Sequence, residues 1–153
     1  MKTKTIALII SLVFVSVALG FQDNSQIGTW KLNEGKSKFA GKMRNHTVVY
    51  ETAGDQIKVT VDGVDENGGA THNEWTGKFD GKDYPVTGDA NSDARSYRTV
   101  DKNTVALTGK KGGKETMTGR IVVSADGKMR TVTTTSTDAQ GKKVTNVAVY
   151  DKQ

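Results

Sequence analysis

Apolar and polar residues alternate along most of the chain after its first twenty residues. Every second residue is apolar over 57–62, and over 73–80 Trp75 and Phe79 share one face while charged and polar side chains occupy the other. Alternation with a period of two is typical of strands that bury one face. No later run has helical spacing over ten or more residues. The pattern therefore predicts an all-β protein.

Short turn signals separate these runs at regular intervals. The tripeptide DGK occurs at 80–82 and 126–128, GGK at 112–114 and QGK at 140–142. Asp-Gly and Gly-Gly pairs adopt the positive φ angles that tight hairpins need. About ten strands follow from this punctuation, over residues 28–32, 45–52, 56–62, 71–80, 82–87, 95–100, 103–110, 114–124, 128–136 and 143–151.

The short turns favour antiparallel pairing between strands that are neighbours in sequence. Ten such strands in an open sheet would leave two unpaired edges, and closure of the sheet removes both. We therefore predict an antiparallel up-and-down meander of about ten short strands closed into a β-barrel, with a two-sheet β-sandwich as the alternative.

The first twenty residues are typical of a secretory signal peptide. Lys2 and Lys4 precede an uncharged run over 6–19, and Ala18 and Gly20 occupy the −3 and −1 positions of a cleavage site. The uncharged run is shorter than the roughly 20 residues of a spanning helix. We expect cleavage after Gly20, a single barrel domain over 21–153, and a secreted or periplasmic location.

Composition and charge argue against several classes of function. The chain has no cysteine, so neither a disulfide nor a thiol nucleophile is available. Removal of Lys2 and Lys4 lowers the net charge from +5 to +3, and the remaining basic residues lie among acidic ones. This mixed surface does not indicate nucleic-acid binding. A mean hydropathy of −0.52 and 7% aromatic residues also argue against a membrane-spanning barrel.

No catalytic or metal-binding set emerges from the sequence. His46 and His72 are its only histidines, and they fall on separate predicted strands. His72 shares the outward face with Glu74, whereas His46 is in register with Val48 and could turn inward or remain at the strand end. Zinc sites use three or four close ligands, and no hydrolase, zinc-protease or phosphate-loop motif is present. We expect no enzyme activity, no metal and no cofactor.

Several segments resemble known barrel proteins. Gly28-x-Trp30 on a first strand, followed by a meander, resembles the lipocalin and fatty-acid-binding proteins of the calycin superfamily, and TNVAVYDKQ at the C-terminus looks like their last strand. The segments GTWKLNEGKSKF, KFDGKDYPVTG and VSADGKMRTVTTTSTDAQGK are similar to small exported bacterial lipocalin-like proteins. The resemblance implies a barrel that binds a small molecule.

The chain also departs from that pattern. Ala148 stands where the fatty-acid-binding branch has the arginine that binds the ligand carboxylate, two residues before Tyr150. Residues 33–44 are too few for that branch's pair of portal helices. Lys152 could pack across Trp30, as a basic residue does in the lipocalin branch. Trp30 itself is then expected to plug the closed end of the barrel.

The inward residues predicted from alternation are mostly aliphatic with a few aromatics, which suits either a lipophilic pocket or a filled core. Two arginines are harder to place. Arg98 shares a face with Val100 and Arg120 with Val122; an inward arginine would require an ion pair or an anionic ligand, while the alternative turns Tyr97 inward and Arg98 outward. The register of 131–138 is unassigned, because threonine suits either face. The candidate ligand-binding residues are Tyr50, Trp75, Phe79, Arg98, Met117 and Arg120.

We therefore expect an exported, monomeric, non-enzymatic protein that binds or carries a small lipophilic or amphipathic ligand. The alternative is a filled barrel that binds a protein or glycan of the cell envelope through its surface. An enzyme built in the barrel cup is the third hypothesis.

Overall fold

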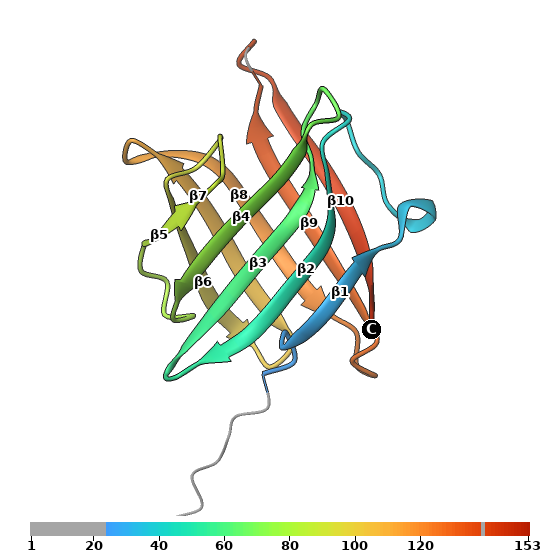
Figure 1. Cartoon of the computed structure of the whole chain (residues 1–153), viewed down its shortest axis with the longest axis vertical. Coiled ribbons are helices and arrows are strands. Elements are labelled where there is room, and N and C mark those ends of the chain that lie inside the picture. The colour runs from blue at the N-terminus through green and yellow to red at the C-terminus, as the bar shows by residue number, and fades with distance from the viewer. Residues whose placement is uncertain (1–23, 139) are drawn as a thin grey trace, which may run out of the picture.

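The computed structural model describes residues 24–138 and 140–153, and these residues form a closed ten-stranded antiparallel barrel (Figure 1). The predicted signal peptide lies outside the described residues. The strands are β1 (Gly28–Leu32), β2 (Arg44–Ala53), β3 (Gln56–Val64), β4 (Ala70–Gly77), β5 (Tyr84–Thr87), β6 (Ala94–Asp101), β7 (Thr104–Lys111), β8 (Lys114–Val123), β9 (Met129–Thr137) and β10 (Lys143–Lys152).

Each strand pairs with its neighbours in sequence, and β1 closes the barrel by pairing with β10 as well as β2. Trp30 lies opposite Lys152 on one side and Val48 on the other. The predicted up-and-down barrel is therefore confirmed, and the sandwich alternative is wrong. All ten strands occur close to their predicted positions.

β5 is the shortest of the ten strands in the barrel. This strand spans only Tyr84–Thr87, and β4 ends at Gly77 rather than at residue 80. Between them the chain bonds to β6 instead: Gly81 N–H donates to Tyr97 O at 2.8 Å and Thr99 N–H to Phe79 O at 3.3 Å. Phe79 therefore follows β4 instead of belonging to it.

A cluster of aromatic rings fills the interior beside this segment. Tyr97 lies at its centre, with ring centroids 4.6 Å from Trp75 and 5.3 Å from Phe79. The Trp75 indole also donates a hydrogen bond of 2.8 Å to Arg95 O. Edge and offset contacts of this kind add to the stabilisation that burial of the rings provides.

Trp30 lies at the end of the barrel where β1 starts and β10 ends, and it is fully buried. Its indole N–H donates to Gln26 O at 2.8 Å, so the segment before β1 covers this end. Lys152 Nζ lies 5.2 Å from the Trp30 ring centroid, and a Cβ on Gly28 would lie 2.7 Å from Lys152 Cε. Trp30 therefore plugs the closed end, and Gly28 leaves room for the lysine that covers it.

Five connections lie at the other end of the barrel. They are β1–β2, which contains the short 3-10 turn η1 (Glu34–Lys36), the β3–β4 and β5–β6 loops, the tight β7–β8 turn, and the β9–β10 loop. A portal of two helices is not present in β1–β2, in agreement with its length. No helix in the described part of the chain is long and apolar enough to span a membrane.

Candidate functional site

The barrel interior contains a cavity of about 740 Å³ that opens between the β1–β2, β3–β4, β5–β6 and β9–β10 connections. Its mouth is lined by loop residues such as Phe39, Met43 and Glu66, and its walls by inward side chains of the strands. Trp75 and Trp30, which are fully buried, do not line it. Some inward residues thus pack into a filled core, while others line an open cavity.

Two arginines lie within this cavity, on β6 and β9. Arg95 and Arg130 are 6% and 3% exposed as whole residues, and both line the cavity. Burial of a guanidinium is costly unless it finds partners. The contacts of these two side chains therefore indicate what the cavity can hold.

Arg95 is paired within the protein. Its Nη2 donates to Asp89 Oδ2 at 2.8 Å, and the pair is nearly buried. Nη1 donates to Asn73 Oδ1 at 3.3 Å and to the Tyr97 hydroxyl at 3.5 Å. Asp89 lies in the β5–β6 loop, so this ion pair ties the loop to the barrel wall.

Arg130 has no such partner. Its Nη2 donates to the Tyr50 hydroxyl at 2.9 Å, and neither Nε nor Nη1 is hydrogen-bonded to any described residue. Aromatic rings surround it instead: Cζ lies 4.5 Å from the Tyr50 centroid, 5.5 Å from Tyr150 and 5.8 Å from Trp30.

The tyrosines beside Arg130 are neutral hydroxyls over the physiological range. Burial raises the pKa of Tyr150 to about 12, although Arg130 opposes this shift. Burial also raises the pKa of Tyr50, again against the lowering effect of Arg130. Neither phenol therefore ionises to neutralise the guanidinium.

The six predicted site residues fall into three groups. Tyr50 and Met117 line the cavity. Trp75 and Phe79 pack in the aromatic cluster without lining it. Arg98 and Arg120 are exposed on the outer face, so an inward orientation is wrong for both. Strict alternation gives the reason, because Tyr97 and Ile121 occupy the inward positions beside them.

Arg95 and Arg130 were missed by sequence reasoning, although a signal existed for each. Arg95 is two residues before Tyr97, so it takes the inward face once Tyr97 does. Arg130 is two residues before Val132, but the run that follows it is rich in threonine, which suits either face, so alternation does not set its register. Val132 lines the cavity and is paired with Ala148 and Ile121, which also face inward.

The histidines lie outside the cavity. His72 faces outward beside Asp62, with Nδ1 and Oδ1 2.6 Å apart, and His46 is exposed near Glu34. His46 therefore does not turn inward. Among the described residues there is no group of three or more histidine and acidic side chains that could hold a metal ion.

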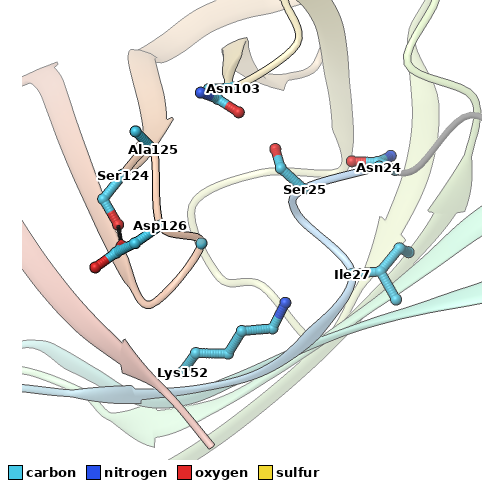
Figure 2. Close-up of a pocket in the computed structure, with 9 residues that line it drawn as sticks. Asn24, Ser25, Ile27, Asn103, Ser124, Ala125, Asp126 and Lys152 are labelled. Carbon is cyan, nitrogen blue, oxygen red and sulfur yellow. Dashed lines mark hydrogen bonds between the residues drawn. The ribbon is translucent and has the colours of Figure 1, made fainter.

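A second, more open hollow of about 450 Å³ lies at the closed end (Figure 2). Its walls come from the segment before β1, the turn at Asn103 and the β8–β9 turn, with Lys152 beside them. Asp126 accepts hydrogen bonds from Ser124 Oγ and from the Lys128 N–H within its own turn. This carboxylate is therefore used to hold the turn.

The sequence matches no protein-family model, and a search of curated proteins also finds no match.

Solved barrels do match the structure. One is EF1p2_mFAP2b bound to DFHBI, with a TM-score of 0.51 and 8% identity over 84% of this chain and 94% of that chain. A redesigned barrel, mFAP1, bound to DFHBI has a TM-score of 0.46 and 11% identity over 84% and 95%. The zebrafish ileal bile acid-binding protein with cholic acid gives 0.48 and 12% over 84% and 99%. At these identities, the first match shows a shared barrel fold.

Proposed function

We propose that this protein is an exported, non-enzymatic carrier that binds one small lipophilic or amphipathic molecule inside its barrel. The observation that carries the proposal is the cavity of about 740 Å³ with a mouth at one end. Ligand pockets commonly span roughly 300–1,000 Å³ and combine apolar walls with a few polar groups. The solved barrel of similar fold was determined with a small molecule bound.

The walls suit an amphipathic ligand. Aliphatic side chains such as Val61, Leu107 and Ile121 line the cavity together with Tyr50 and Arg130. Apolar groups provide non-directional affinity through burial, while buried polar groups select for a matching ligand atom. The predicted signal peptide supports a role outside the cytoplasm.

The neutral dye Nile red tests the proposal directly. We expect saturable fluorescence enhancement at one site per chain. Ala148→Phe should reduce the affinity for the dye about tenfold or more. Its ring would occupy space inside the cavity, so the dye would bury less of its apolar surface on binding. Thr145→Phe, on the exposed face of the same strand, should leave binding unchanged.

Native mass spectrometry of protein purified from its own host provides a second readout, in which a co-purified lipophilic molecule is expected. The carrier proposal is abandoned if the dye does not saturate and no bound molecule is found. Equal dye binding by Ala148→Phe and the unmodified protein would place the dye outside the barrel and also contradict the proposal.

A further inference from the structure

Arg130 is a buried cation for which the described residues provide no counter-charge. Its hydrogen-bonding partner is a neutral hydroxyl, that of Tyr50, and no carboxylate of residues 24–138 or 140–153 lies within ion-pair distance. The same cavity contains a direct comparison, because Arg95 is paired with Asp89. Of two buried arginines, only one is neutralised by the protein.

The rings around Arg130 stabilise the cation without neutralising it. The faces of Tyr50, Tyr150 and Trp30 lie within 6 Å of Cζ, the range in which a ring attracts a cation. Arginine remains charged in proteins, so one positive charge is left over at the deep end of the cavity. An anion placed there would make charge-assisted hydrogen bonds in surroundings that water barely reaches.

The charges at the mouth have the opposite sign. Asp65, Glu66 and Asp138 line the cavity from the mouth loops, and none of the three forms an ion pair with another described residue. No described lysine lines the cavity. An anionic group at the mouth would meet these carboxylates, whereas at the deep end it would meet Arg130.

We propose that Arg130 binds the anionic head of a singly charged amphiphile, which enters head first and leaves its apolar tail toward Phe39 and Met43 at the mouth. This inference rests on the proposed function and specifies its ligand class: a carboxylate, sulfate ester or similar monoanion on an apolar body. The neutral hydroxyls of Tyr50 and Tyr150 lie beside the head and can donate hydrogen bonds to it.

Decanoate and 1-decanol test the proposal, since they have the same chain length and differ in head charge. Both are measured by displacement of Nile red. The unmodified protein should bind decanoate about 10- to 100-fold more tightly than decanol, the range expected of a charge-assisted hydrogen bond. Arg130→Gln should abolish this preference and leave decanol affinity within about twofold.

Arg98→Gln and Arg120→Gln are matched controls. Each removes one positive charge from the exposed face of the barrel, so each should keep the preference for decanoate. Loss of the preference in either control, or its survival in Arg130→Gln, would overturn the assignment to Arg130.

The outcomes separate this inference from the proposed function. Equal binding of decanoate and decanol to the unmodified protein would contradict the anion site while the barrel still binds a ligand. Absence of saturable Nile red binding would contradict the carrier proposal and, with it, the anion site.

A measurement on the unmodified protein covers the case in which Arg130→Gln does not fold. Decanoate enriched with ¹³C at the carboxyl carbon should keep a carboxylate chemical shift when bound, at a pH where free decanoate is half protonated. Its terminal methyl group should show contacts to the Met43 methyl group. A bound signal that titrates like free decanoate, or a terminal methyl group that contacts Tyr150, would refute head-first binding.

Discussion

At the scale of the residue, two basic side chains lie against the ring of Trp30, one outside the barrel and one inside it. Trp30 closes the barrel floor, and Lys152 covers its ring from outside. Arg130 approaches the Trp30 ring from within, at 5.8 Å. Trp30 therefore lies between an exterior and an interior cation: it plugs the barrel without lining the cavity, and its ring packs against the arginine that does line it.

Replacement of Trp30 should destabilise the protein strongly. Trp30→Ala removes a fully buried indole, and we expect its free energy of unfolding to fall by about 3–5 kcal/mol. Urea unfolding followed by circular dichroism measures the loss. Trp30→Phe serves as the control and should lose less, since it retains a ring; a loss below about 1 kcal/mol for Trp30→Ala would contradict the role as plug.

At the scale of the element, β5 makes few pairings with its neighbours, whereas the loop after it is held by side-chain contacts. β5 has only four residues, and β4 pairs with it at just two positions. The loop that follows it, however, is held by the ion pair of Asp89 with Arg95 and by a hydrogen bond from the Lys111 ammonium to Ala90 O. Side-chain contacts thus replace ladder hydrogen bonds along part of the cavity mouth.

A pair of glycine substitutions tests how closely this loop must approach β4. Gly88 and Gly54 both have positive φ, at 77° and 64°. A Cβ on Gly88 would lie 2.2 Å from His72 O, whereas one on Gly54 would have no atom of the described residues within 4 Å. Gly54→Ala should therefore cost about 1 kcal/mol from backbone strain, and Gly88→Ala about 2–4 kcal/mol because overpacking is added.

Thermal and urea unfolding of both variants supply the comparison. Nile red binding is expected to weaken in Gly88→Ala only, because residues 88–92 line the cavity. Equal stability of the two variants would show that the loop can move away from β4 without cost.

At the scale of the whole molecule, closure of the barrel creates the site. The pairing of β1 with β10 joins the two edges of the sheet, and the longer loops lie at the end of the barrel opposite the start of β1 (Figure 1). Trp30 plugs the end at which β1 starts. A closed barrel of this size can hold one small ligand. Apolar burial and strand hydrogen bonds stabilise it, since the chain has no cysteine.

Export is a prediction for the whole chain and can be measured on it. When the full chain is produced in a bacterial host, the intact mass of the exported protein should correspond to residues 21–153, because Ala18 and Gly20 fit a cleavage site. Ala18→Arg should prevent cleavage. Accumulation of the uncleaved chain inside the cell, with both sequences, would contradict export.

The sequence by itself determined the strands and their order, because alternation and glycine turns are local signals. Alternation places Tyr50 and Trp75 inside, and the resemblance of the Gly28-x-Trp30 segment places Trp30 there. Only the tertiary structure decided which inward residues line open space. Trp75 packs in a filled cluster while Tyr50 faces a cavity, and this depends on how strands distant in sequence curve around each other.

The arginines illustrate the same limit. Arg98 and Arg120 are candidates from the sequence because each shares a strand face with a valine, Val100 or Val122, yet both are exposed. Arg130 lies in a run where threonine conceals the register, and its inward position follows only from its pairing with Tyr150 and Val123. Cross-strand register, which the sequence does not encode locally, decided which cation is buried and hence what the cavity can bind.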